Sequence, residues 1–244
     1  MNLKNKVVLI TGGVVRVGRA ISLELNKTGA KIFCQYFSSS DSALSLKEEV
    51  ENIGGNIHLF QSDLSDQKGI KQTVDEVIRI YGRIDILINN AALFFRTPLG
   101  NVKEKDWDTL HTLNLKSPFF LAQAVSKFMI EQKSGKIINI ADAGAETPFP
   151  AYIPYSISKA GIINMTKGLA KALAPNIQVN CISPGPVMFP ESYSEEDRNF
   201  ALEQTLLKRE GSAEDIAKTA RFLLEGSDFI TGAVIPVDGG RHVR

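Results

Sequence analysis

The chain has 244 residues, of which 28 are Lys or Arg and 27 are Asp or Glu, so its net charge is +1. This near-neutral composition, with 43% hydrophobic residues, is typical of a globular protein and gives no reason to expect nucleic acid or an anionic membrane as a partner. Because α/β domains commonly reach this length and no apolar run approaches the roughly 18 residues of a membrane span, we expect one domain over residues 1–244 in a cytoplasmic protein.

Short β-branched runs alternate with longer amphipathic stretches along almost the whole chain. Several short runs are continuously apolar, as parallel strands covered by helices on both faces require. We therefore predict an α/β fold with a doubly wound, parallel, seven-stranded sheet and helices on both faces. The predicted strands are 6–11, 31–36, 56–61, 84–89, 136–141, 177–182 and 233–237. The predicted helices are 18–28, 41–53, 67–81, 104–131, 154–173 and 213–225, with Ser65, Pro154 and Ser212 at three of their starts.

A glycine-containing turn, Thr11-Gly12-Gly13-Val14-Val15-Arg16-Val17-Gly18, links the first predicted strand to the first helix. Glycines at such a turn let the backbone approach a pyrophosphate, which free N–H groups and the positive end of the helix dipole then bind. Two glycines alone are weak evidence, but the turn opens a series of β–α units. Gly12, Arg16, Val17 and Gly18 are therefore predicted to bind a dinucleotide.

The end of the second predicted strand reads Gln35-Tyr36-Phe37-Ser38-Ser39-Ser40, and no carboxylate precedes Asp41. A site for NAD normally carries Asp or Glu here to bind the ribose 2′-hydroxyl. We predict NADPH instead, with Arg16 and the hydroxyls of Ser38, Ser39 and Ser40 near the 2′-phosphate. The serines also have the composition of a helix cap, and the two roles are compatible.

The two cysteines, Cys34 and Cys181, fall within predicted buried strands. Free cysteine behaves as a small apolar residue in a core, and disulfides are rare in reducing compartments. We therefore expect two reduced core thiols rather than a disulfide, and no metal site.

Tyr155 and Lys159 lie four residues apart in a predicted helix, so their side chains share one face. A nearby ammonium group favours the phenolate, and we expect it to lower the pKa of Tyr155 from about 10 towards the working pH. Tyr155 would then exchange a proton with a substrate. The alternative is an exposed pair without chemistry.

With these residues the chain resembles the short-chain dehydrogenase/reductase family over its full length. The motifs that carry the resemblance are the glycine turn, Asp63-Leu64, Asn89-Asn90-Ala91-Ala92, Asn114, Tyr155-Ser156-Ile157-Ser158-Lys159, Pro184-Gly185 and Asp238-Gly239-Gly240. The resemblance implies a Rossmann fold and catalytic roles for Tyr155 and Lys159, with Asn114 holding a water in the proton relay. A buried structural amide is the alternative for Asn114. The implied cofactor site adds Asp63, Leu64, Asn90, Ala91, Tyr155, Lys159, Pro184 and Gly185.

Two residues depart from the common family pattern and resemble pteridine reductases. Arg16 stands where the family usually has a second glycine, and Asp142 replaces a serine thirteen residues before the tyrosine. In that subfamily the arginine contacts cofactor phosphate and substrate, and the aspartate works with the tyrosine in protonating the pterin. The segment 90–99 also resembles the corresponding segment of pteridine reductases. The resemblance puts Phe94 where a phenylalanine of those enzymes stacks on the pterin. The C-terminal segment 238–244 is similar to bacterial dihydromonapterin reductases.

The chemistry of a pterin matches these residues. A flat, electron-poor bicycle stacks between a nicotinamide and an aromatic ring, and its N–H groups suit a carboxylate acceptor. We predict NADPH-dependent reduction of a dihydropterin to a tetrahydropterin, with oxidised pterin or dihydrofolate as further possible substrates. The predicted substrate-binding residues are Arg16, Phe94, Asp142, Tyr155 and Pro186. Asp142 as a turn cap, Phe94 as loop packing and Arg16 as a nucleotide contact alone are the alternatives.

The competing prediction is a short-chain carbonyl reductase, such as a 3-oxoacyl-thioester reductase. A cofactor-binding regulator without chemistry is disfavoured because Asn114, Tyr155 and Lys159 are all present. The family resemblance implies a homotetramer formed through the helices 104–131 and 154–173. The irregular segment 183–193 is predicted to form a lid or substrate loop. His242 and Arg244 either reach towards a neighbouring active site or form a solvated tail.

Overall fold

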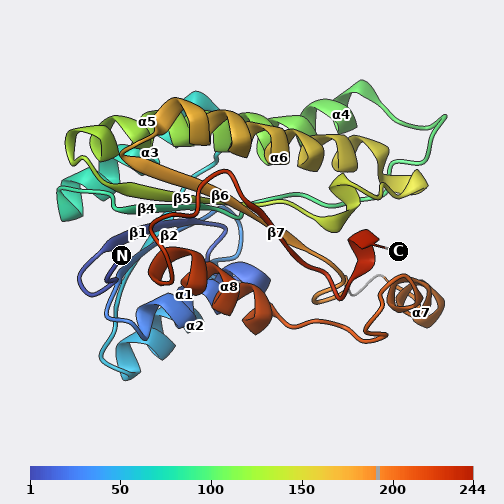
Figure 1. The fold of residues 1–244 in the computed structure, drawn as a ribbon, viewed down its shortest axis with the longest axis horizontal. Helices are drawn as coiled ribbons and strands as arrows, with labels where there is room; N and C mark the ends of the chain where they lie inside the picture. The colour runs from blue at the N-terminus through green and yellow to red at the C-terminus, as the bar shows by residue number, and fades with distance from the viewer. Residues whose placement is uncertain (191–192, 244) are drawn as a thin grey trace.

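A computed structural model describes residues 1–190 and 193–243, and Glu191, Ser192 and Arg244 lie outside the described residues. In the described part of the chain, seven parallel strands form one sheet in the order β3-β2-β1-β4-β5-β6-β7, which confirms the predicted doubly wound architecture (Figure 1). The strands are β1 (Val7–Thr11), β2 (Lys31–Tyr36), β3 (Asn56–Gln61), β4 (Ile86–Asn89), β5 (Gly135–Ile140), β6 (Ile177–Pro184) and β7 (Val234–Val237).

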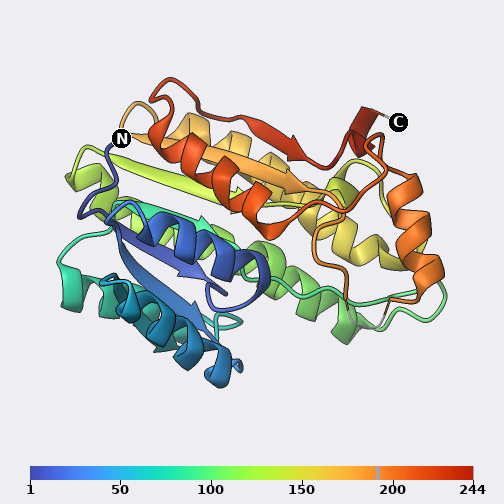
Figure 2. The same ribbon diagram turned by 90° about the horizontal axis from the view of Figure 1, so that it is seen from below.

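Helices cover both faces of the sheet (Figures 1 and 2). One face carries α1 (Arg16–Asn26), α2 (Ser40–Asn52) and α8 (Ala213–Glu225). The other carries α3 (Gln67–Tyr81), α4 (Glu104–His111), α5 (Ser117–Glu131) and α6 (Ile153–Leu173). Successive strand residues point to opposite faces, so Ile10 and Ile88 pack in the first layer while Leu9 and Leu87 pack in the second. Both layers are apolar, which explains the continuous apolar runs in the sequence.

The strand order reverses at β1, and this reversal positions the site. Ile10 of β1 lies beside Cys34 of β2 on one side and beside Ile88 of β4 on the other. The connections after β1 and β4 therefore diverge to opposite faces and leave a crevice at the carboxyl ends of the strands, where open α/β sheets bind their ligands.

The predicted helix 104–131 is interrupted by a π-helical turn, Thr112–Lys116. Pro118 has no N–H to bond the carbonyl four residues earlier, at Asn114. The Ser117 N–H bonds the Thr112 carbonyl instead, which inserts one residue into the turn. Such insertions often occur at functional sites, and Asn114 lies within this one.

Two further differences concern helix starts. Asp66, rather than Ser65, caps α3, because its carboxylate accepts from the Gly69 N–H over 2.6 Å. The predicted starts at Pro154 and Ser212 are confirmed. The irregular segment after β6 is followed by α7 (Glu195–Glu203), a helix that the sequence analysis did not predict.

Both cysteines lie in buried strands, as predicted, and neither is paired. Burial raises the pKa of Cys34 to about 12 and that of Cys181 to about 11, so both thiols stay protonated. Among the described residues, no helix combines the length and the apolar composition needed to span a membrane.

Candidate functional site

The turn after β1 requires glycine at two positions. Gly12 has a φ of 59°, and a Cβ on Gly18 would lie 2.1 Å from the Gly12 carbonyl oxygen. The Gln35 side chain accepts from the Gly12 N–H over 3.2 Å and donates to the Ser62 carbonyl over 2.7 Å. The Gly12 N–H is therefore already bonded, contrary to the expectation of a free glycine amide. No described side chain caps α1, which leaves its N-terminal amides available to an anion.

A cavity of about 400 Å³ runs from this turn to Tyr155 along the carboxyl ends of the strands. It brings together fourteen of the predicted cofactor-binding residues: Gly12, Arg16, Val17, Gly18, Ser38, Ser39, Asp63, Leu64, Asn90, Ala91, Tyr155, Lys159, Pro184 and Gly185. Ser40 is not on its wall, because it begins α2. Tyr36 and Phe37 line the same end as the serines and were missed by the sequence analysis.

The shape of this cavity fits a dinucleotide. A Cβ on Gly12 would lie 3.1 Å from the Ala91 Cα, and one on Gly185 would lie 2.5 Å from the Asp238 Cα, so neither position has room for a side chain. The helix terminus at one end suits a pyrophosphate, and the wall that follows β2 carries no charge to repel a phosphate. The residues present therefore suit a phosphorylated nicotinamide dinucleotide.

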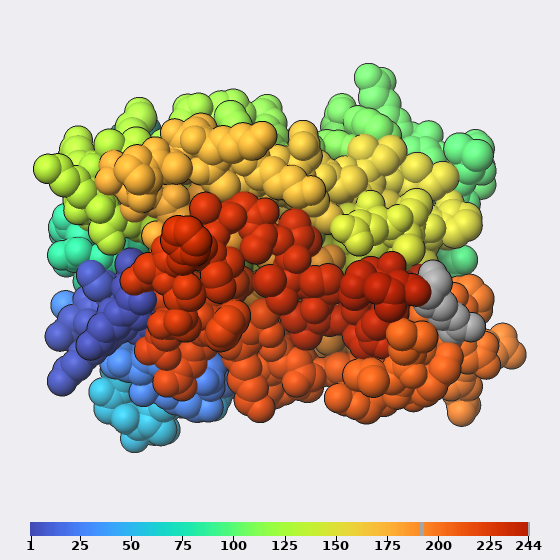
Figure 3. Space-filling view, in the orientation of Figure 1, coloured from blue at the N-terminus to red at the C-terminus, as the bar shows by residue number. Residues whose placement is uncertain are grey.

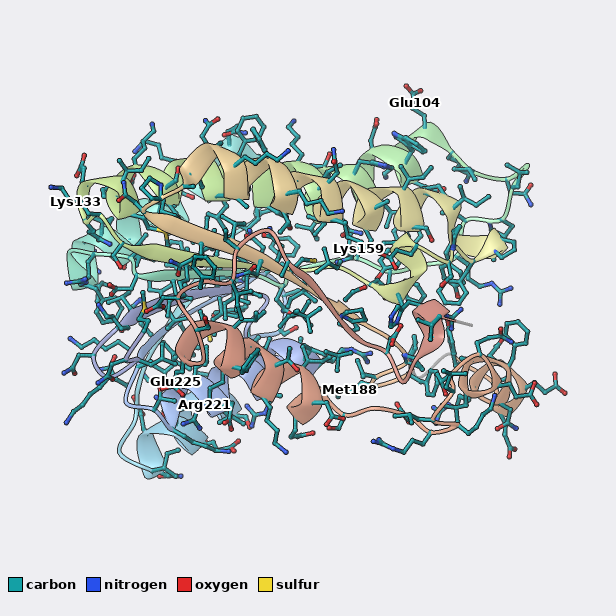
Figure 4. All side chains as sticks on the ribbon, in the orientation of Figure 1. Glu104, Lys133, Lys159, Met188, Arg221 and Glu225 are labelled. Atoms are coloured by element: carbon teal, nitrogen blue, oxygen red, sulfur yellow. The ribbon has the colours of Figure 1, made fainter. Side chains whose placement is uncertain are left out.

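Arg16 lines this cavity and also the smaller one beside it. Its φ is 50°, in the left-handed region that favours glycine and costs another residue roughly 1–2 kcal/mol. Its guanidinium donates to the Met188 carbonyl on the loop after β6. Figure 4 shows Met188 in the same half of the molecule as Lys159, far from Arg221 on α8. A strained arginine between two cavities is the kind of outlier that functional sites retain.

Asp142 and Tyr155 are directly bonded. The Tyr155 hydroxyl donates to Asp142 Oδ2 over 3.0 Å, and Asp142 Oδ1 accepts from the Gly144 N–H over 2.6 Å. Asp142 thus caps the turn after β5 and also accepts from the tyrosine. Lys159 Nζ lies 5.9 Å from the Tyr155 ring centroid and donates to the Ile140 carbonyl over 2.9 Å.

The expected lowering of the Tyr155 pKa is wrong for this arrangement. Burial, and then the adjacent negative charge of Asp142, raise the pKa of Tyr155 well above its usual value. Burial also raises the pKa of Asp142, although the Gly144 N–H and the Lys159 charge oppose it. Burial lowers the pKa of Lys159, which further weakens its effect on the phenol. Burial thus favours the uncharged form of both Tyr155 and Asp142.

Asn114 lies next to the site but its side chain is engaged elsewhere. The amide oxygen accepts from the Leu93 N–H over 2.8 Å, and the amide nitrogen donates to the Leu93 carbonyl over 2.9 Å. A weaker bond of 3.3 Å reaches the Ser158 hydroxyl. Asn114 therefore fixes the loop after β4 at the residue before Phe94.

A second cavity, of about 190 Å³, shares the Asp142–Tyr155 wall with the first. All five predicted substrate-binding residues line it, namely Arg16, Phe94, Asp142, Tyr155 and Pro186. The Phe94 ring stacks on Tyr152 at 4.5 Å and meets Tyr155 edge-on at 4.7 Å, so it also packs against the start of α6 and the turn before it. The segment predicted as a lid or substrate loop forms one wall through residues 185–190 and Tyr193.

Four residues of this wall lie outside both the predicted site residues and the predicted loop: Ala143, Phe149, Ala201 and Arg241. His242 is held on its own chain, with Nδ1 2.9 Å from Asp238 Oδ2, and Arg244 lies outside the described residues. The C-terminal turn lies against α7 in Figure 3.

Known proteins that are similar to this chain in sequence and in fold include oxidoreductases. A family model described as Enoyl-(Acyl carrier protein) reductase matches residues 13–242. The 3-oxoacyl-[acyl-carrier-protein] reductase FabG of Thermotoga maritima is 38% identical and is matched over 98% of this chain and 99% of its own length.

The similarity extends to solved structures. FolM alternative dihydrofolate reductase 1 of Brucella canis, complexed with NADP, has a TM-score of 0.92 at 32% identity, over 100% of this chain and 96% of that chain. A short-chain dehydrogenase/reductase of Serratia marcescens has a TM-score of 0.94 at 30% identity, over 99% and 100%. A blue fluorescent protein from a metagenomic library, in complex with NADPH, has a TM-score of 0.89 at 33% identity, over 99% of both chains. The chain therefore belongs to the short-chain dehydrogenase/reductase family.

Proposed function

We propose that the protein is an NADPH-dependent reductase of dihydropterins. The observation that carries the proposal is the hydrogen bond from Tyr155 to Asp142, in a cavity that also contains Phe94 and Arg16. An aromatic wall and a carboxylate acceptor suit a flat heterocycle with N–H groups. The structural similarity to a FolM dihydrofolate reductase supports the same class of substrate.

The larger cavity would hold the cofactor. The first amides of α1 would bind its pyrophosphate, with Arg16, Ser38 and Ser39 near the 2′-phosphate and Lys159 at the nicotinamide ribose. Two of the similar solved structures contain NADP or NADPH, which supports this choice. When bound, NADPH supplies a hydride to the imine carbon of the pyrazine ring.

The residues of the chain would manage the proton. Tyr155 would donate its hydroxyl proton to the ring nitrogen beside the reduced carbon, and a proton taken up from solvent would return to the phenolate through Asp142, to which Tyr155 is bonded. Burial and the charge of Asp142 raise the pKa of Tyr155, which favours the protonated phenol that donates. Phe94 covers one face of the bicycle, and Asn114 positions the loop that carries Phe94.

The competing function is reduction of a 3-oxoacyl thioester, which the similarity to FabG of Thermotoga maritima favours. A ketone needs a hydrogen-bond donor where this chain has Asp142. The hydroxyl of Tyr155 is also committed to that carboxylate. These contacts favour an N–H substrate over a ketone.

A screen of NADPH oxidation tests the proposal. The substrates are dihydrobiopterin, dihydromonapterin, dihydrofolate and an oxoacyl thioester. We expect turnover of at least one dihydropterin and none of the thioester. Turnover of the thioester without any pterin would select the carbonyl reductase, and NADPH binding without oxidation by any substrate would select a regulator.

We also propose a homotetramer formed through α4, α5 and α6. These helices enclose an apolar groove of about 810 Å³ that includes Leu115, Phe119, Gly161 and Met165. Phe119 is 41% exposed, which is unusual for a side chain of its size. Light scattering should give four times the chain mass, and a monomeric mass would reject the proposal.

A further inference from the structure

Arg241 is a buried charge in the wall of the second cavity. Its exposed fraction is 8%, and its guanidinium lies 4.3 Å from the centroid of the Phe149 ring. Its Nε is buried and has no hydrogen-bond partner among residues 1–190 and 193–243. A buried guanidinium donor without an acceptor is costly, so a structure that keeps one has a use for it.

The backbone holds Arg241 in place. Asp238 Oδ1 accepts from the Gly240 N–H over 2.9 Å, and Oδ2 accepts from the His242 N–H over 2.8 Å. The Leu206 N–H, just after α7, donates to the Gly239 carbonyl over 2.8 Å. The turn that carries Arg241 is therefore bonded on both sides, and the aromatic ring of Phe149 supports the guanidinium from below.

The second cavity thus contains one carboxylate and two guanidinium groups between aromatic walls. Asp142 and Arg241 both line it, yet they form no ion pair among the described residues. Arg16, the other cation, donates to the Met188 carbonyl, which leaves Arg241 as the cation whose donor lacks an acceptor.

The size of the cavity limits what fits between these charges. About 190 Å³ is below the roughly 300–1,000 Å³ typical of sites for whole drug-sized ligands, so it suits a ring system rather than a long chain. A planar ring that bonds both charged groups must present N–H donors to Asp142 and an oxygen acceptor to the guanidinium of Arg241.

We infer that Arg241 is a substrate-binding residue whose guanidinium donates to a ring carbonyl oxygen, on the edge opposite the N–H groups that Asp142 accepts. The inference rests on the proposed function and deepens it, because it makes the ring carbonyl a requirement of the site. A dihydropterin carries a ring carbonyl and, on the opposite edge of the bicycle, a ring N–H group.

Arg241→Met tests the assignment. Methionine keeps an unbranched apolar stem against Phe149 and removes every N–H donor. The probes are a pterin and the same bicycle with an amino group in place of the ring carbonyl, each titrated by equilibrium binding in the presence of NADP⁺. We expect the variant to weaken binding of the carbonyl compound by about 10- to 100-fold and that of the amino compound by less than about threefold.

The control is Arg221→Met on α8, at the other side of the molecule in Figure 4, where Arg221 pairs with Glu24 and Glu225. It should leave both affinities unchanged. Equal weakening of both compounds by Arg241→Met would indicate a packing role and overturn the inference, as would no weakening of either. If Arg241→Met does not fold, Arg241→Gln is titrated in the same way.

The wild-type titration separates the two claims. If the wild type binds and reduces a dihydropterin and Arg241→Met binds it with unchanged affinity, the inference is overturned but the proposed function stands. Wild-type protein that neither binds the pterin nor reduces it contradicts the proposed function and the inference together.

Discussion

The Tyr155 hydroxyl donates a hydrogen bond to Asp142 Oδ2 over 3.0 Å, on the wall that the two cavities share. A serine at position 142 would offer the tyrosine a neutral hydroxyl, whereas the carboxylate is an acceptor that favours the protonated phenol. The two buried groups therefore titrate as a pair with raised pKa values. This arrangement suits donation of a proton to a substrate nitrogen.

Tyr155→Phe should fold and bind NADPH normally but lose turnover, because it removes one hydroxyl from the site. A positioned acid contributes about 10²–10⁴-fold, so kcat for a dihydropterin should fall by that factor. The control is Tyr81→Phe at the end of α3, whose hydroxyl bonds Asn56 Oδ1 over 3.0 Å. Near-wild-type kcat in Tyr155→Phe would remove the tyrosine from the mechanism.

Arg16→Ala should weaken NADPH binding more than NADH binding. A hydrogen bond to a charged group is worth about 1.5–3 kcal/mol, so the NADPH affinity should fall about 10- to 100-fold in fluorescence titrations. Arg19→Ala is the matched control, since Arg19 lies on the same helix and pairs with Glu49 at 2.6 Å. An unchanged ratio of the two affinities would mean that Arg16 does not contact the 2′-phosphate.

Phe94→Ala should raise KM for the dihydropterin and leave kcat largely intact. Loss of stacking costs about 0.5–1.5 kcal/mol, to which the lost apolar contact adds. Leu99→Ala, in the same loop and 82% exposed, is the control. A KM equal to that of the wild type would assign Phe94 to loop packing alone.

Asp85→Asn should destabilise the fold far from the site. Burial opposes ionisation of Asp85, but bonds from Arg83 and the Val7 N–H outweigh it and lower its pKa. A lowered pKa stabilises the folded state above the ordinary carboxyl pKa, and this stabilisation is lost as pH falls through the folded value. At pH 7 the variant should lose about 1.5–3 kcal/mol in urea unfolding.

The same variant should also lose less stability on acidification than the wild type does. Asp75→Asn is the control, because Asp75 forms an exposed pair with Lys71, and such pairs contribute about 1 kcal/mol or less. Equal effects of the two substitutions would show that burial of Asp85 does not matter.

Much of the fold was predictable because its signals are local. Strand β2 has the predicted limits, and the starts of α6 and α8 follow from Pro154 and Ser212. The missed helix α7 also had a signal, the capping box of Ser194 and Asp197, which the preceding proline-rich segment obscured.

Site residues that belong to a sequence motif could be predicted. Site residues that come together only through contacts between distant segments could not. The sequence analysis predicted Tyr155, Asp142 and Phe94, and the structure brings them together. Burial and then the adjacent charge of Asp142 reverse the expected direction of the tyrosine pKa, which spacing from Lys159 alone does not reveal. Arg241 was missed because it lies far from Phe149 in the sequence. Only the tertiary structure brings its guanidinium over the Phe149 ring.

The Asp142–Tyr155 pair also determines the pH dependence. Because its pKa values are raised, dihydropterin reduction should be fastest with the pair protonated and should decline as pH rises through the apparent pKa of the pair. Asp142→Ser removes the carboxylate from the pair. The pH at which the rate declines should therefore differ between this variant and the wild type.

The most direct test of the account is kcat/KM of Asp142→Ser for a dihydropterin, with the affinity for NADPH measured in parallel. Loss of a charged hydrogen bond and of the proton relay should cost about 2–5 kcal/mol, or roughly 30- to 5,000-fold in kcat/KM. The affinity for NADPH should change much less, and a carbonyl substrate should lose no activity. Reduction of dihydropterins by Asp142→Ser at the parental rate would contradict the pterin assignment and favour the carbonyl reductase.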